Sequence, residues 1–503
     1  MDTLHSLLYG FYIGLQPGNL LFCFIGVLIG TLVGVLPGIG PVGAISILLP
    51  ATFRMSPVAA IIMLAGIYYG AMYGGSTTSI LVNIPGEAAS VVSCIDGYEM
   101  AKNGRAGPAL GIAAFGSFIA GTLGLIGLML FASPLAEFAL RFGSPEYSAL
   151  ILLGLTLITY LSHGSVVKAL MMGAFGIILS CIGLDHIHGS PRMVFNVMQL
   201  WDGVGLVPLA MGLFGISEVL INIERAIKPE GLKTKIESFL PTLADWMQSK
   251  GAILRGSVLG FILGILPGGG GVIASFLSYS LEKRISKQPE RFGKGAIEGL
   301  AGPESANNAA TSGAFVPLFT LGIPTNVVMA LLFGALLIHG IRPGPLFLQD
   351  HPDLFWGVIS SMYVGNVMLL ILNLPLIPIW VKVLKIPYRI LFPLILLFCI
   401  LGSYSLNKSV FDVLVMMIFG LFGYLFRKFE YEAAPLMLAF VLGPMFETNL
   451  RQSLLLSKGS FLIFFVRPIS AVFVGIAIIL FVTSSIPYFT KAGEKGESSK
   501  VKD

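Results

Sequence analysis

Two clusters of hydroxyl and amide side chains are surrounded by strongly apolar sequence. The first cluster comprises Ser76, Thr77, Thr78, Ser79 and Asn83, followed by Pro85 and Gly86. The second comprises Glu304, Ser305, Asn307, Asn308, Thr311 and Ser312, followed by Pro324, Thr325 and Asn326. Hydroxyl and amide groups donate hydrogen bonds to carboxylates, and their oxygens also ligate hard cations. These residue types therefore predict a site for a polar anion together with a coupling ion.

Ordinary helix packing is the alternative, because Ser, Thr and Asn commonly bond between membrane helices. We favour that alternative for any single Ser or Thr. For Asn307 and Asn308 beside Glu304 we favour binding, because an ionisable group inside a membrane is costly to retain. Glu304 at the membrane edge, as a charge near a helix N-terminus, is the other interpretation.

The elements that must position these clusters are membrane helices. The chain has 503 residues, of which 55% are hydrophobic and 11% charged, whereas soluble domains carry about 25% charged residues. Runs without Asp, Glu, Lys or Arg cover 6–53, 55–86, 106–136, 305–341 and 468–490. A helix of about 20 apolar residues spans a bilayer, so we predict an all-α polytopic membrane protein with roughly 10–14 membrane segments.

A glycine-rich motif occurs twice, 230 residues apart: residues 30–40 read GTLVGVLPGIG and residues 260–270 read GFILGILPGGG. The stretches around Pro85 and Pro324 follow in the same order. We therefore predict two homologous transmembrane halves, residues 1–222 and 251–490. Inverted repeats are the usual design for such a duplication and are our expectation, with parallel repeats as the alternative.

Charged segments join and end the predicted halves. Residues 223–250 form a linker rich in Lys and Arg, which places it in the cytoplasm. The polar residues 491–503 are expected to form a disordered tail.

The first glycine motif also has the Gly38-x-Gly40-x-x-Gly43 spacing of a dinucleotide-binding loop. That loop needs a preceding strand and an acidic residue about 20 residues later. Apolar sequence surrounds the motif instead, and no acidic residue occurs between Asp2 and Glu87. A nucleotide site is therefore disfavoured.

Proline removes a helical hydrogen bond and glycine permits positive φ, so the two motifs predict broken membrane helices. Freed backbone groups must line protein or a watery cavity, where N–H groups suit carboxylates and carbonyls suit a small hard cation. Close packing of small residues is the alternative. The candidate binding residues here are Pro37, Gly38, Gly40, Pro267, Gly268, Gly269 and Gly270, with a sodium ion placed near Gly38, Gly268 and Asn307.

The sequence resembles the large membrane subunit of tripartite tricarboxylate transporters, the TctA family, over nearly its whole length. The resemblance is carried by GVLPGIGP, by the segment from YGGSTTSILVNIPGEAAS to GIAAFGSF, by GILPGGGGVIASFLSYSLEK, and by FGKGAIEGLAGPESANNAATSGAFVPLFTLGIP. One departure is Thr325, where the family pattern usually has glycine, and it puts the geometry of the second site in question.

The resemblance implies a multi-pass carrier in the bacterial inner membrane, importing citrate-like tricarboxylates or related carboxylates on a sodium or proton gradient. It implies two partners, a periplasmic solute-binding protein and a small membrane subunit, and no cofactor beyond the coupling cation. Nucleic-acid binding is not expected, and no catalytic Ser-His-Asp or Cys-His arrangement indicates an enzyme. A channel and the permease of an ATP-driven importer are the alternative functions.

Overall fold

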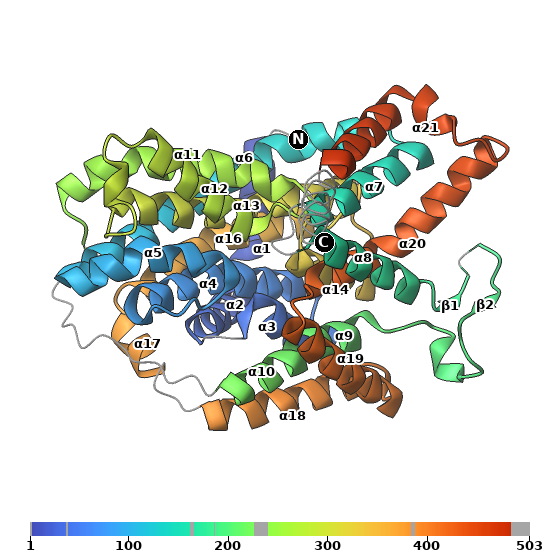
Figure 1. The fold of residues 1–503 in the computed structure, drawn as a ribbon, viewed down its shortest axis with the longest axis horizontal. Helices are drawn as coiled ribbons and strands as arrows, with labels where there is room; N and C mark the ends of the chain where they lie inside the picture. Colours follow the sequence, from blue (N-terminus) through green and yellow to red (C-terminus); the bar gives the residue numbers. More distant parts are fainter. Residues whose placement is uncertain are drawn as a thin grey trace, which may run out of the picture. The chain divides into compact units, whose positions relative to one another are not determined.

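The computed structural model describes residues 3–36, 39–160, 165–185, 187–225, 240–383 and 388–483. These residues are almost entirely helical, with one two-stranded antiparallel sheet among them. Figure 1 shows the helices coloured along the sequence. The prediction of an all-α membrane protein is confirmed.

Seven helical segments among the described residues are long and apolar enough to cross a membrane. They are Pro17–Val35, Pro57–Val82, Ala88–Ala139, Leu206–Glu224, Pro352–Asn373, Val410–Lys428 and Ala433–Leu456. Shorter apolar helices are also present, so the total number of crossings stays a prediction.

The chain divides into two compact units. The first unit contains residues 1–139 and 205–425, and the second contains 140–204 and 426–503. Each predicted half of the sequence contributes to both units, so the units are not the halves. The boundaries of the halves and the direction of the repeat stay predictions.

The first unit holds most of the helices, and α19 runs from it into the second unit. Its elements are α1 (Thr3–Gly14), α2 (Pro17–Val35), α3 (Gly40–Leu48), η1 (Leu49–Arg54), α4 (Pro57–Val82), η2 (Ala88–Ser90), α5 (Val91–Met100), η3 (Ala101–Arg105), α6 (Ala106–Ala139), α9 (Leu206–Ala210), η5 (Met211–Ile216), α10 (Ser217–Arg225), α11 (Leu243–Ile265), α12 (Gly270–Ile285), η6 (Pro289–Arg291), α13 (Ile297–Leu321), α14 (Val327–Ile338), α15 (Phe347–Asp350), α16 (Pro352–Asn373), α17 (Ile377–Val383), α18 (Tyr388–Asn407) and α19 (Val410–Lys428).

The second unit is smaller. It contains α7 (Ser144–Tyr160), α8 (Val166–Ser180), β1 (Gly183–Leu184), β2 (Pro191–Arg192), η4 (Met198–Leu200), α20 (Ala433–Leu456) and α21 (Ile463–Val466).

Two segments that the sequence singled out lie partly or wholly outside the described residues. The predicted linker covers residues 223–250, of which residues 226–239 are not described. Within it, α10 ends at Arg225 and α11 begins at Leu243. The predicted tail 491–503 lies entirely outside the described residues.

Small residues at intervals of four bring the main helix pairs of the first unit together. Gly26, Gly30 and Gly34 of α2 lie against the backbone of α4. Gly256, Gly260 and Gly264 of α11 lie against the backbone of α13 in the same way, each 230 residues further along the chain. A side chain at any of these glycines would overlap a backbone carbonyl of the facing helix. These glycines therefore serve close helix packing, the alternative given above. The glycines just before each Leu-Pro-Gly break thus position helices.

Helices α4 and α13 are buried inside the protein for nearly their whole length. In α4, 94% of the most apolar window is buried. Both polar clusters lie on these two helices, so their side chains face protein and not lipid. This placement lets a membrane helix carry a carboxylate and two amides.

Candidate functional site

As predicted, each glycine motif separates two helices. Helix α2 ends at Val35 and α3 begins at Gly40, and α11 ends at Ile265 and α12 begins at Gly270. Gly40, Gly268 and Gly270 have positive φ, which a glycine adopts without a steric penalty. Pro37 and Gly38 lie outside the described residues.

The second interruption in each region follows α4 and α13. Helix α4 ends at Val82 and α13 ends at Leu321, and the C-cap residues that follow, Asn83 and Gly322, both adopt the left-handed conformation. Asn83 and Gly322 lie 239 residues apart, the same separation as Pro85 and Pro324. Positive φ therefore falls at Gly322 and not at Thr325, which is absent from the positive-φ residues. The replacement of glycine by Thr325 thus puts no left-handed strain on the turn.

The two kinds of interruption lie against each other. In the first region Gly86 packs so tightly on Gly34 that a Cβ at Gly86 would overlap the Gly34 carbonyl oxygen. In the second region the Gly268 N–H donates a hydrogen bond of 2.8 Å to the Thr325 carbonyl. The backbone N–H and C=O groups of an irregular segment in a membrane must form hydrogen bonds within the protein. The bond between Gly268 and Thr325 gives a partner to one such group in each of the two interruptions of the second region.

The polar side chains of the two clusters meet at Glu304. The Glu304 carboxylate on α13 accepts a hydrogen bond of 2.5 Å from the Ser76 hydroxyl on α4. Its other oxygen accepts one from the Ser93 hydroxyl on α5. Glu304 is 1% exposed and, among the described residues, has no cationic partner. Glu304 is therefore buried within α13 and is not its N-cap, which is Ala296.

The two amides next to Glu304 point to different neighbours. The Asn308 amide donates hydrogen bonds of 2.7 Å to the Ser117 hydroxyl on α6 and 3.0 Å to the Glu304 carbonyl. The Asn307 amide donates one of 3.3 Å to the Glu87 carboxylate. The Asn307 carbonyl oxygen is buried without a hydrogen-bond partner and lies against Gly271 at the start of α12.

The remaining predicted residues fall into three groups. Thr78 donates a hydrogen bond of 2.8 Å to the Val35 carbonyl, which ties the first cluster to the end of α2. Ser305 and Thr325 are buried, and their hydroxyls have no hydrogen-bond partner among the described residues. Asn83 is exposed and Gly269 packs on Leu263, so these two lie apart from the carboxylate.

A small cavity adjoins this polar region. It is lined by Tyr73, Ser76, Thr77, Leu110, Ala113, Ala114, Ser117 and Asn373. The cavity is of the size that holds a water molecule. Ser76 therefore contacts both the cavity and the Glu304 carboxylate.

Sequence reasoning missed Glu87, Ser93 and Tyr68. Glu87 caps η2 through a 2.7 Å hydrogen bond from the Ala89 N–H and also contacts Asn307. Tyr68 of α4 accepts a 3.2 Å hydrogen bond from Asn326, the N-cap of α14. Glu87 carries a signal that could have found it, because it is the first acidic residue after Asp2. Ser93 and Tyr68 carry no comparable signal.

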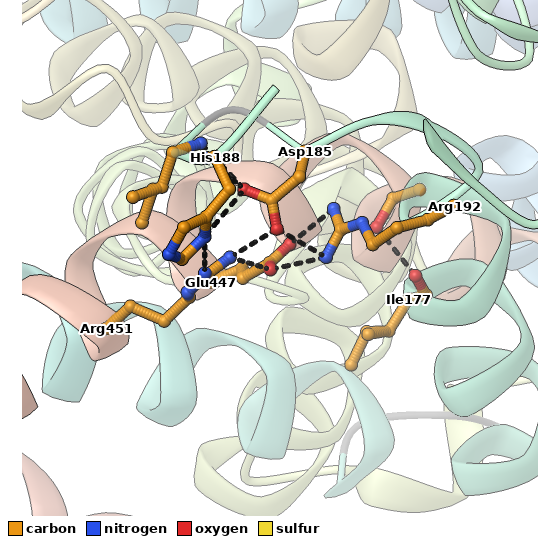
Figure 2. A network of polar contacts seen from close by, with 8 residues as sticks. Ile177, Asp185, His188, Arg192, Glu447 and Arg451 are labelled. Carbon is orange, nitrogen blue, oxygen red and sulfur yellow. Dashed lines mark hydrogen bonds and ion pairs between the residues drawn. The ribbon is translucent and has the colours of Figure 1, made fainter. Parts of the chain in front are cut away.

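The second unit holds a separate polar network, shown in Figure 2, that fastens the β1–β2 hairpin to α20. Arg192 forms hydrogen bonds of 2.6 and 3.1 Å to the two oxygens of Glu447. Arg451 donates to Asp185 at 2.7 Å and to Glu447 at 3.0 Å. The Arg451 guanidinium, followed by the N–H groups of His188 and Ile187, holds the pKa of Asp185 well below its usual range.

This network is structural. Its cations and carboxylates balance each other, and no group of three metal-ligating side chains occurs in the described part of the chain. Arg451 lies 2.7 Å from the His188 Nδ1. Because a guanidinium can only donate, Nδ1 accepts and the imidazole carries its hydrogen on Nε2.

Comparison with known proteins decides the family. Residues 20–438 match the model of the tripartite tricarboxylate transporter TctA family. The chain belongs to the TctA family.

Two relatives from Agrobacterium vitis extend this result. One, an uncharacterized 52.8 kDa protein in the TAR-I ttuC' 3' region, is 50% identical over 496 residues, which cover 98% of this chain and 99% of that protein. The other, an uncharacterized protein in the TAR-II ttuC' 3' region, is 52% identical over 228 residues, covering 45% of this chain and 94% of its own length. No solved structure matches the chain.

Family membership makes this TctA-family chain a membrane-embedded, multi-pass transporter component. The family is one of transporters and not of enzymes. Its tripartite organisation implies partner subunits. The interrupted helices and the buried carboxylate cluster are thus parts of a transporter.

Proposed function

We propose that this chain is the carrier subunit of a binding-protein-dependent secondary transporter in the bacterial inner membrane. Its substrates are tricarboxylates or related carboxylates, and a sodium or proton gradient drives their import. A periplasmic solute-binding protein delivers the substrate, and a small membrane subunit completes the complex. Family membership supports these partners and this substrate class.

The observation that carries the proposal is the contact between Ser76 and Glu304. It joins the two polar clusters, which lie 228 residues apart in the sequence, beside two sets of interrupted helices. A substrate between these clusters would meet hydroxyls such as Ser305 and Thr325 and the Asn307 side chain. The predicted N–H donors at Gly268 and Gly269 are bonded to the Thr325 and Leu266 carbonyls in this conformation, so they would have to be released to bind it. The buried hydroxyls without partners are groups that a bound ligand would satisfy.

A carrier accounts for this arrangement better than a channel. Ser76, Thr77, Thr78, Glu304 and Asn307 are each at most 5% exposed, and the adjoining cavity has room for water but not for a carboxylate. An occluded site of this kind requires rearrangement before substrate enters, as alternating access does. A channel requires a continuous open path.

Uptake of labelled citrate into proteoliposomes tests the proposal. The vesicles contain this chain with its small subunit, the binding protein is outside, and ATP is absent. Uptake that needs the binding protein and either an imposed sodium or an imposed proton gradient is the expected result. If the binding protein holds citrate tightly and neither gradient drives uptake, secondary transport is refuted.

If the binding protein ignores citrate, the same assay is repeated with other carboxylates to which that protein does bind. Uptake that depends on ATP and a partner ATPase would instead establish the ATP-driven alternative. A substrate flux that does not level off as the concentration of the binding protein is raised would establish a channel.

A further inference from the structure

The Glu304 carboxyl group has surroundings that suit a proton. Its two oxygens contact the hydroxyls of Ser76 and Ser93, and it has no Lys, Arg or His partner among the described residues. A carboxylate buried without a cation pays a large desolvation cost, and taking up a proton removes that cost. Glu304 is therefore a group whose charge can change during transport.

Hydrogen counting at Ser76 shows how both charge states fit. The Ser76 oxygen lies 3.1 Å from the Met72 carbonyl and 2.5 Å from a Glu304 carboxyl oxygen. A hydroxyl has one hydrogen, so it can donate to only one of these oxygens at a time. When Ser76 donates to Met72, the short contact requires Glu304 to be protonated and to donate. When Glu304 is ionised, the Ser76 hydrogen turns toward it.

The two states differ by one proton on Glu304 and by the direction of the Ser76 hydroxyl, and Ser93 can donate to the other Glu304 oxygen in both. Ser76 also lines the water-sized cavity, together with Tyr73, Thr77 and Ser117. A water molecule there can accept a hydrogen bond from these hydroxyls or donate one to them. It would link Glu304 to a proton donor or acceptor outside the cluster.

Two of the other titratable groups around Glu304 already have roles of their own. Tyr73, Glu87 and Cys94 face it from α4, the start of η2 and α5. Tyr73 donates to Asn366 at 2.6 Å, and Glu87 serves as the cap of η2.

Several acidic groups on the helices that pack against α13 have partners of their own. Glu282 of α12 is bonded to Arg255 of α11 at 2.8 and 2.6 Å. Asp245 of α11 is bonded to Arg105, and Asp96 of α5 accepts three backbone N–H groups. Tyr279 of α12 lies near Asp96. Glu304 is thus the carboxyl group here that lacks both a cation and a backbone cap.

We propose that Glu304 carries the coupling proton, with Ser76 as the positioning residue that passes it to and from the cavity. A hydronium ion in the cavity gives one proton to the Ser76 oxygen while the Ser76 hydrogen moves to a Glu304 carboxyl oxygen, which leaves water in the cavity and restores the Ser76 hydroxyl. After the conformational change, the reverse transfer releases the proton to water on the other side of the membrane. No other bond is formed or broken. The inference rests on the proposed function and selects the proton from its two coupling ions.

Two assays on Glu304→Gln test it, because glutamine keeps a neutral, hydrogen-bonding side chain that cannot release a proton. The first assay measures uptake driven by an imposed proton gradient, with substrate-linked proton movement followed by a pH dye. The second measures exchange of labelled for unlabelled substrate across the vesicle, which needs no net proton movement. We expect gradient-driven accumulation to fall to the level of protein-free vesicles, and exchange to stay within roughly tenfold of wild type, as for a change of one hydrogen bond.

Two further variants complete the test. Ser76→Ala removes the turning hydroxyl, and we expect it to displace the midpoint of the pH profile of uptake while exchange persists. Thr320→Val is the control, because Thr320 is a buried hydroxyl on α13, the helix of Glu304, and bonds only the Val316 carbonyl at 2.7 Å. It should leave both assays and the pH profile unchanged.

Each adverse outcome has a distinct meaning. Accumulation driven by the proton gradient in Glu304→Gln would overturn the inference, as would loss of exchange in a variant that folds and inserts normally. Sodium-driven uptake by wild type without proton movement would also overturn it, while the proposed function would stand. Failure of wild type to transport under either gradient would refute the proposed function and this inference together.

Discussion

The hydroxyl of Ser76 lies 2.5 Å from the carboxyl group of Glu304, so two residues 228 positions apart share one buried hydrogen bond. Ser76 belongs to α4 and Glu304 to α13, the helices that carry the two polar clusters. The bond is therefore one of the hydrogen bonds that join the two predicted halves of this TctA-family transporter.

This contact predicts energetic coupling between the two helices. We expect Ser76→Ala and Glu304→Ala, which both remove the hydrogen bond, to show an interaction free energy of about 1–2 kcal/mol in a double-mutant cycle. Thermal or denaturant unfolding in detergent measures it. Strict additivity of the two changes would show that the bond contributes nothing to stability.

The amide of Asn307 should matter for transport more than for folding. Its carbonyl oxygen is buried without a partner, so Asn307→Ala removes a group available to a ligand. We expect uptake to fall by about tenfold, the effect of losing one acceptor for a hydrogen-bond donor of the ligand or for a bound cation. Asn449→Ala is the control, because Asn449 donates only to the Met445 carbonyl one turn away. Unchanged uptake in both Asn307→Ala and Asn308→Ala would remove the proposed site.

Gly260 should be essential to the packing of α11 on α13. A Cβ at Gly260 would overlap the backbone of Ala306. Neither helix can shift to relieve this overlap without losing other contacts. We expect Gly260→Ala to lower the free energy of unfolding by about 2–3 kcal/mol, the cost of overpacking. Gly173→Ala in α8 is the control, since a Cβ at Gly173 meets nothing within 4 Å. Equal melting temperatures for the two variants would contradict this account of the motif.

Asp96 should hold the chain in place before α13. One of its oxygens accepts N–H groups of Gly293, Gly295 and Ala296 at 2.9, 2.8 and 2.8 Å. Asp96→Ala leaves three donors without their acceptor, so we expect a loss of about 3 kcal/mol of stability. The control is Asp202→Ala, which changes an exposed side chain. Hydrogen exchange of residues 293–300 locates the effect, and unchanged protection there would contradict the assignment.

Acid should loosen the β1–β2 hairpin of the second unit. The guanidinium of Arg451 lowers the pKa of Asp185 below its ordinary value of 3.8 in the folded state. The ionised carboxylate therefore stabilises the hairpin at pH values above its unfolded-state pKa. This contribution is lost as pH falls from that value through the lower pKa of the folded state.

Limited proteolysis of the hairpin as a function of pH measures this effect. Wild type should resist cleavage at neutral pH and become sensitive only in strong acid. Asp185→Asn should be more sensitive at neutral pH and respond less to acid. A pH response that is the same in both would assign the effect to another carboxylate.

The sequence by itself determined the class of protein and the places where its helices are interrupted. Long runs without charge require a membrane, and a Leu-Pro-Gly or Ile-Pro step breaks a helix through its own backbone. Both effects act within a few residues, so they can be read without knowing the fold. The breaks between Val35 and Gly40 and between Ile265 and Gly270 lie where these motifs predict them. Family membership is likewise determined by the sequence alone.

Only the tertiary structure decided which polar groups meet. Nothing in the sequence indicated that Glu304 would contact Ser93, that Glu87 would contact Asn307, or that Asn308 would turn to Ser117. Each contact joins helices distant in the chain, and its geometry depends on how closely those helices approach. That approach is set by small residues such as Gly260, which allow backbone contact along a whole helix. Partner choice in a buried cluster is therefore a property of the packed helices and not of either segment alone.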